Sequence, residues 1–159
     1  MFIETVPFIL QRIDHVKILV PDRLEAAQWY QRVFGLKPLQ GKVFDMAAAS
    51  PDGPLFLGVD DDLQSVKVVL LVGEPLGKHT PISVTRVSFG VDAASFLLLL
   101  DRLADLELVN EKDERVTRDL IVDQWIGWSI YFSDPYGNRF EVTTYDYAAV
   151  KSQLNAAKA

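Results

Sequence analysis

The chain has 159 residues, of which 49% are hydrophobic and 24% charged, a composition typical of a globular protein with one domain or two small similar ones. The net charge of −6 argues against nonspecific binding to nucleic acid or an anionic membrane, and no apolar run is long enough to span a bilayer. The absence of cysteine excludes disulfides, thiolate zinc sites and cysteine nucleophiles. Because residues 1–10 make a poor signal peptide, we expect a cytoplasmic protein.

Apolar alternation over residues 12–20 predicts a first strand, which Pro21 ends. Asp22 is a suitable N-cap for a helix over residues 23–34, whose apolar positions follow helical spacing, and Gly35 suits its C-terminal end. The apolar positions of this helix are Leu24, Ala27, Tyr30 and Phe34. Three further strands are expected at residues 37–48, 55–59 and 66–72.

The pattern then restarts after a polar link. Residues 82–91 are expected to form a strand, Asp92 a helix cap, and residues 93–104 a helix with a broad apolar face. The remaining expected elements are strands at residues 107–115, 127–132 and 139–145 and a short helix at residues 147–159.

The order of elements is therefore β-α-β-β-β twice, and the first strands superpose at an offset of 86 − 15 = 71 residues, with Arg86 over His15. Two such sheets packed face to face would close one concave cavity between them. We divide the chain into an N-terminal extension (1–11), a first module (12–74), a link (75–81), a second module (82–146) and a helical tail (147–159).

Residues 129–142 carry the clearest local signal, which is a strand, a tight turn and a second strand. The turn is Asp134-Pro135-Tyr136-Gly137-Asn138, in which Pro fixes φ at one corner and Gly or Asn accepts a positive φ at the next. This turn places Glu141 early in the second strand.

Three segments together resemble the vicinal oxygen chelate superfamily, which comprises glyoxalases, bleomycin-resistance proteins, fosfomycin-resistance proteins and extradiol dioxygenases. They are residues 13–22 with the helix end at 27–36, residues 87–91, and residues 131–141. The resemblance implies an α+β fold in which two βαβββ modules form a cupped mixed sheet, usually assembled as a homodimer. It does not identify a substrate, because one fold hosts many functions.

The resemblance also implies where a divalent cation would bind. Members that use a metal take a ligand from the first strand of each module and a carboxylate from the last strand. His15 and Glu141 match two of these ligands, but Arg86 stands where the second histidine is expected, and a guanidinium cannot ligate a cation. The alternative carboxylate position, late in the first module, falls on Leu70 (141 − 71). We therefore expect no tightly bound metal.

Alternation along the strands predicts which side chains share the cavity face. Lys17 goes with His15, Ser88 with Arg86, and Thr143 with Glu141; Tyr131 either hydrogen-bonds a ligand or packs across strands. The hypothesis is that Arg86 replaces the metal as the fixed positive charge. It would either pair with Glu141 or bind an anionic group.

Three functions stay open. The first is binding of a small anionic or polar organic molecule, with turnover undecided and no catalytic residue assigned. The second is a lyase, isomerase or dioxygenase that uses Fe, Mn, Zn or Ni held by His15, Glu141 and a third ligand from His79, a partner chain or water. The third is a structural or regulatory dimer whose cavity an Arg86–Glu141 ion pair closes. Trp125 and Trp128 either wall the cavity or pack in the core or dimer interface.

Overall fold

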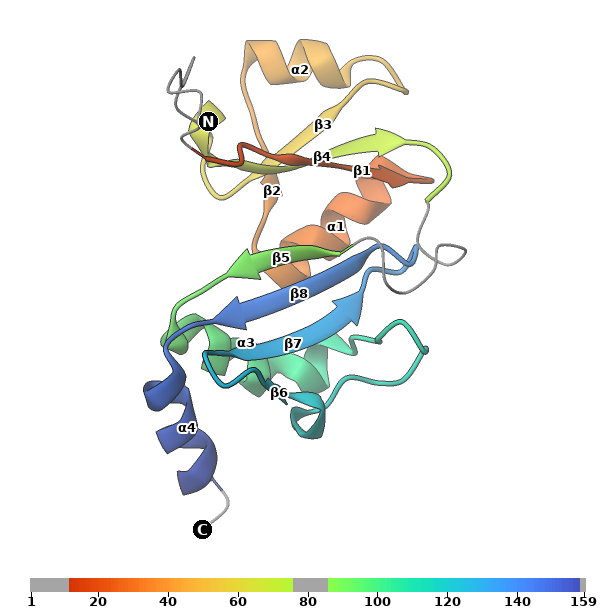
Figure 1. The fold of residues 1–159 in the computed structure, drawn as a ribbon. Coiled ribbons are helices and arrows are strands. Elements are labelled where there is room, and N and C mark those ends of the chain that lie inside the picture. Colours follow the sequence, from red (N-terminus) through yellow and green to blue (C-terminus); the bar gives the residue numbers. More distant parts are fainter. Residues whose placement is uncertain (1–11, 76–85, 158–159) are drawn as a thin grey trace, which may run out of the picture.

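A computed structural model describes residues 12–75 and 86–157 and shows two four-stranded mixed sheets with helices packed on them (Figure 1). The first sheet has the order β1-β4-β3-β2 and the second β5-β8-β7-β6. The first module contains β1 (Val16–Val20), α1 (Arg23–Phe34), β2 (Lys37–Pro38), α2 (Lys42–Ala48), β3 (Leu55–Gly58) and β4 (Val66–Val72). The second contains β5 (Val87–Gly90), α3 (Ala93–Leu106), β6 (Val122–Asp123), β7 (Trp128–Ser133) and β8 (Arg139–Thr144), followed by α4 (Tyr147–Ala156).

The predicted α+β class and the repeat of two βαβββ modules are confirmed. In each sheet the first strand runs parallel to the last, and the other pairings are antiparallel. Helix α1 begins and ends as predicted, because the Asp22 side chain accepts the backbone N–H groups of Leu24 and Glu25 and Gly35 adopts a φ of 70°. Asp92 caps α3 in the same way, by accepting the N–H of Ser95.

Two predicted strands are wrong. Residues 37–48 form only the short β2 followed by α2, where Lys, Met and Ala favour a helix and Phe44 packs on Phe56 with ring centroids 5.5 Å apart. Residues 107–115 form a turn with isolated bridges from Val109 to Arg115 and to Ser133, and β6 follows them unpredicted. The extension at residues 1–11, the start of the strand expected at 82–91, and His79 lie outside the described residues.

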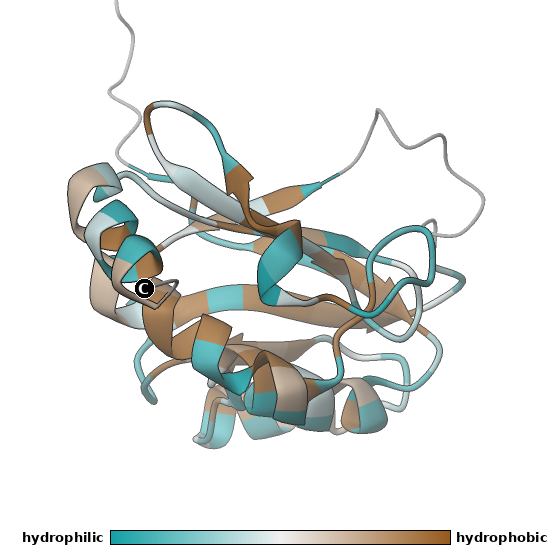
Figure 2. Ribbon diagram, turned by 90° about the horizontal axis from the view of Figure 1, so that it is seen from below, coloured by the Kyte–Doolittle hydropathy of each residue, from teal (hydrophilic) through white to brown (hydrophobic). Residues whose placement is uncertain are grey.

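Helix α1 lies between the two sheets (Figure 1), and its residues belong to one apolar cluster with the inner faces of both. Tyr30 and Val33 are buried in one cluster with Ile18 and Leu57 of the first sheet. The ring centroid of Phe34 lies 5.2 Å from that of Phe89 in the second sheet. Figure 2 shows the resulting pattern, with apolar segments along the strands and alternating polar and apolar positions on the helices.

The position of α1 changes one expectation. The two sheets turn their outer faces away from α1, because side chains alternate along each strand and the inner sides are buried in the cluster that contains the helix. The outer face of the second sheet is polar, whereas that of the first carries Lys17 beside Phe56 and Val69, which pack in a second apolar cluster with Phe44 of α2. A single chain therefore does not close a cavity between the two outer faces. In the part of the chain that the structure describes, no helix is long and apolar enough to cross a membrane.

The carboxylate of Asp134 joins the two modules at a buried point. Its Oδ2 accepts hydrogen bonds from the Tyr30 hydroxyl on α1 at 2.9 Å and from the Asn138 side-chain amide at 2.7 Å. Its Oδ1 accepts the backbone N–H groups of Tyr136 and Asn138 at 2.9 and 2.8 Å. Burial raises the pKa of Asp134, which these four donors oppose, and burial beside this carboxylate raises the pKa of Tyr30.

The substitution Tyr30→Phe is expected to lower the free energy of unfolding by about 1.5–3 kcal/mol, because a buried carboxylate loses one of its donors. Urea denaturation measures the change. Tyr136→Phe is the matched control, since the Tyr136 hydroxyl reaches Glu25 at the surface over 3.4 Å, and it should cost less than about 0.5 kcal/mol. Equal losses for the two variants would contradict the role given to Tyr30.

Candidate functional site

The outer face of the second sheet brings four of the predicted site residues together. Ser88 on β5 pairs with Glu141 on β8, and Glu141 pairs in turn with Tyr131 on β7. Thr143 occupies the next position on the same face of β8, opposite Ser129. The intervening residues of these strands point into the apolar core, so this face is polar by the period-two pattern.

Glu141 sits in a network of hydroxyl groups. Its Oε1 accepts hydrogen bonds from Ser129 at 2.7 Å and from the Tyr131 hydroxyl at 3.2 Å. The Tyr131 oxygen itself accepts the side-chain amide of Gln124 at 2.6 Å. Within the described residues, Oε2 of Glu141 has no hydrogen bond, so it can accept one from a bound molecule. Sequence patterns missed Gln124, because it lies outside any predicted strand.

Arg86 immediately precedes β5 and stacks on the ring of Tyr131, with its Cζ 4.4 Å from the ring centroid. Its Nη2 lies 3.7 Å from Oε1 of Glu111. An Arg86–Glu141 ion pair, one of the two alternatives left open for Arg86, is not among the ion pairs of the described residues. Arg86 stacks on the face of the Tyr131 ring, and the Tyr131 hydroxyl donates a hydrogen bond to Glu141. The carboxylate that pairs with Arg86 is that of Glu111.

The electrostatics of this network act on Tyr131. Partial burial raises the pKa of Tyr131, and the neighbouring Glu141 charge raises it further. The Arg86 charge works in the opposite direction but is the smaller cause. Tyr131 is therefore held as a neutral hydrogen-bond donor to Glu141.

The first module presents His15 and Lys17 near the start of β1. His15 Nδ1 lies 2.8 Å from Oδ2 of Asp14, and hydrogen bonds from His15 and then Arg12 lower the pKa of Asp14. Lys17 is exposed and pairs with Val69, just as Ser88 pairs with Glu141. Val69, and not Leu70, therefore stands at the position equivalent to Glu141.

The residues present do not fit a two-histidine, one-carboxylate metal site. Arg86 offers only N–H donors, Val69 carries no ligand atom, and α1 separates the sheets that carry His15 and Glu141. No group of three or more potential ligand residues occurs among residues 12–75 and 86–157.

The two tryptophans have different surroundings. Trp128 stacks on Tyr147 with ring centroids 5.3 Å apart, and its Nε1 donates to the Tyr147 carbonyl at 3.1 Å, so it packs α4 against the sheet. Trp125 is exposed in the turn between β6 and β7.

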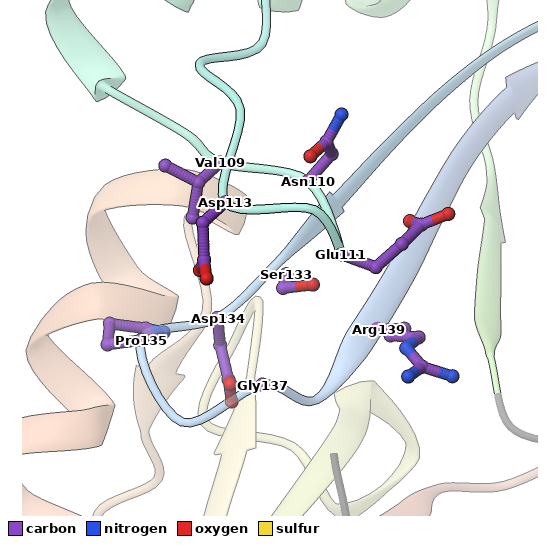
Figure 3. A pocket seen from close by; sticks show the side chains of 9 residues that line it. All are labelled: Val109, Asn110, Glu111, Asp113, Ser133, Asp134, Pro135, Gly137 and Arg139. Atoms are coloured by element: carbon purple, nitrogen blue, oxygen red, sulfur yellow. The ribbon is translucent and has the colours of Figure 1, made fainter. Parts of the chain in front are cut away.

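A pocket of about 200 Å³ borders the polar face, between the turn at residues 109–113 and the β7–β8 turn (Figure 3). Ser133 and Arg139, which pair across β7 and β8, form part of its wall. Glu111 and Asp113 line the pocket from the opposite side, where they belong to the turn at residues 109–113. The pocket therefore extends the polar face at the end where Arg86 lies.

Comparisons with known proteins agree on the fold. A family model described as the Glyoxalase/Bleomycin resistance protein/Dioxygenase superfamily matches residues 12–142. The fosfomycin resistance protein FosX from Mesorhizobium loti is 20% identical, with a TM-score of 0.55 over 86% of this chain and 93% of that one.

Two further solved structures are similar. The FosX protein from Listeria monocytogenes, complexed with Mn(II) and sulfate ion, is 16% identical, with a TM-score of 0.58 over 92% of this chain and 99% of that one. Oxidase ChaP-H1 is 19% identical, with a TM-score of 0.56 over 85% and 96%. No match was found among curated proteins.

Substitutions at the two neighbouring charges should move the Tyr131 pKa in opposite directions. Glu141→Gln removes a negative charge that disfavours the phenolate, so the pKa should fall. Arg86→Ala removes a positive charge that favours it, so the pKa should rise. NMR titration of tyrosine labelled at Cζ measures both, with the other tyrosines as internal controls. Movement in the same direction would show that the charges do not act on Tyr131 as described.

Proposed function

Since the chain belongs to the glyoxalase/bleomycin resistance protein/dioxygenase superfamily, we propose that it binds a small organic anion on the polar face of its second sheet. Arg86 supplies the positive charge there, in the position where a metal-using relative would carry a ligand. The observation that carries this proposal is the stacking of Arg86 on Tyr131, next to a Glu141 oxygen that accepts no hydrogen bond within the described residues.

Arg86 has the donors needed for this role. A guanidinium presents five N–H groups in a planar fork that matches a carboxylate. In the described part of the chain, Arg86 makes no hydrogen bond, only the ion pair to Glu111 at 3.7 Å and the ring contact. Within the described residues, the N–H groups of the guanidinium thus have no hydrogen-bond acceptor, and a ligand can supply one.

Glu141 gives the ligand a second anchor. Because Ser129 and Tyr131 hold Oε1, the orientation of the carboxylate is fixed and Oε2 can accept an N–H or O–H group. A molecule with an anionic group at Arg86 and a hydroxyl or amine at Glu141 satisfies both, with Ser88 and Thr143 beside it on the same face.

We also propose that a second copy of the chain completes the binding cavity. The outer faces of the two sheets lie on opposite sides of α1, so one chain cannot enclose a ligand between them. In a homodimer, the first sheet of one protomer can face the second sheet of its partner. His15 and Lys17 would then oppose Arg86 and Glu141 across the cavity, and Lys17 would add to the preference for anions.

A divalent-metal enzyme is the second candidate function. It is favoured by the fold that this chain shares with a FosX structure holding Mn(II), and by His15 and Glu141 at two ligand positions. Fe, Mn, Zn or Ni would then bind with a third ligand from elsewhere, and the Arg86 charge would oppose that binding.

Thermal shift measurements distinguish these candidates. Benzoate or phenyl phosphate at about 100 times its dissociation constant should raise the melting temperature of the wild type by roughly 5–10 °C. Arg86→Ala should abolish the shift, whereas Arg115→Ala, which breaks an exposed ion pair with Glu107, should retain it. Stabilisation by stoichiometric Mn²⁺ or Zn²⁺, lost in both His15→Ala and Glu141→Gln, would support the metal enzyme instead.

Mixed dimers test the shared cavity. Dimers of Lys17→Glu alone or Arg86→Ala alone should bind no benzoate, because every cavity carries one defect. A mixed dimer of the two variants should bind one benzoate per dimer, since one cavity then carries both substitutions and the other carries neither. Calorimetry on differently tagged, co-purified chains gives the stoichiometry. Absence of binding to the mixed dimer would place each cavity within one chain.

A further inference from the structure

We propose that Glu111 competes with the ligand for Arg86 at the anion site. A ligand must displace the Glu111 carboxylate from Arg86 in order to bind. The same carboxylate makes the site select singly charged carboxylates over dianions. The inference rests on the proposed function, because it assigns a selectivity to the same site. It concerns a residue on the turn between α3 and β6 that faces the site from outside the sheet.

Arg86 and Glu111 form an ion pair that contains no hydrogen bond. At 3.7 Å the two charges attract each other, but the separation is too long for a hydrogen bond. The Glu111 side chain is only 18% exposed, less than the 32% of Arg86. Among the described residues, no group donates a hydrogen bond to the Glu111 carboxylate. No side-chain oxygen of the described residues is both buried and without a hydrogen-bond partner, so the Glu111 carboxylate keeps contact with solvent. Because only this long ion pair holds it near Arg86, a ligand that binds Arg86 more closely can replace it.

The backbone that carries Glu111 is well fixed. The Asn110 side-chain oxygen accepts the N–H groups of Lys112 and Glu114 at 2.9 and 3.0 Å, which forms an Asx turn. Ser133 donates its N–H to the Val109 carbonyl at 2.7 Å and ties the turn to β7. Release of Arg86 therefore requires only a rotation of the Glu111 side chain.

The neighbouring pocket gives that side chain somewhere to go. Glu111 lines the pocket of about 200 Å³ together with Ser133 and Arg139, and Figure 3 shows the Glu111 and Arg139 side chains on the same side of it. A rotated Glu111 keeps its charge within this pocket, a short distance from a ligand on Arg86.

The retained charge determines the selectivity. The Arg86 edge already accommodates a carboxylate, so a monocarboxylate ligand replaces Glu111 with a group of the same shape and charge. A dianion in that position is repelled more strongly by the displaced Glu111 than a monoanion is. The site is therefore expected to bind monocarboxylates more tightly than dianions.

The variant Glu111→Gln tests this directly. Calorimetry with the full-length protein should show benzoate binding roughly five- to tenfold more tightly than in the wild type, because the competing charge is gone. Affinity for phenyl phosphate should rise by a larger factor, so that the preference for benzoate narrows. Glu107→Gln makes the same chemical change in an exposed ion pair of 3.8 Å to Arg115, and should alter neither affinity.

Other outcomes are decisive as well. Unchanged or weaker benzoate binding in Glu111→Gln, with Arg86-dependent binding intact in the wild type, overturns the competitor role but leaves the proposed function standing. An equal gain for both ligands overturns the selectivity. Absence of Arg86-dependent binding in both proteins overturns the proposed function together with this inference.

Discussion

The buried carboxylate of Asp134 is the constraint on which the arrangement of the two modules depends. A charge in the interior must be surrounded by donors, and here they come from the β7–β8 turn and from Tyr30 on α1. That requirement fixes α1 against the second module while its other side packs on the first. The inner faces of both sheets then pack in one apolar cluster with α1, and the polar face of the second sheet points outward.

Tyr131 organises the outward face in a comparable way. Its ring supports the Arg86 guanidinium and its hydroxyl binds Glu141, so the cation and the carboxylate are held on one surface without neutralising each other. A direct ion pair would have consumed the binding capacity of both groups. Separation by an aromatic side chain leaves an acceptor at one end and donors at the other, the arrangement on which the proposed binding of a polar organic anion rests.

Local signals in the sequence predicted where the two long helices begin, because Asp22 and Asp92 cap α1 and α3 as expected. The strands expected at residues 37–48 and 107–115 were wrong. The relation between modules was not predictable from the expected stripe on α1. Leu24 in that stripe is exposed, while Trp29, which lies outside the stripe, packs against the core. The role of Glu111 was not predicted, because a run of charged residues usually indicates a solvent-exposed segment. The pairing of Glu111 with Arg86 depends on tertiary structure.

The exchange of histidine for arginine alters what every neighbouring group can do. With a metal, Glu141 would be a ligand; without one, it is a hydrogen-bond acceptor whose orientation the hydroxyls of Ser129 and Tyr131 determine. A guanidinium and a divalent cation repel each other at close range, so the same site cannot hold the Arg86 charge and a metal ion together. A metal ion selects its ligand through the coordination positions that the protein leaves open. A side-chain cation is directional and can be paired with a carboxylate from its own chain, as Arg86 is with Glu111. In the proposed site, Glu111 and the ligand would therefore compete for the same N–H groups.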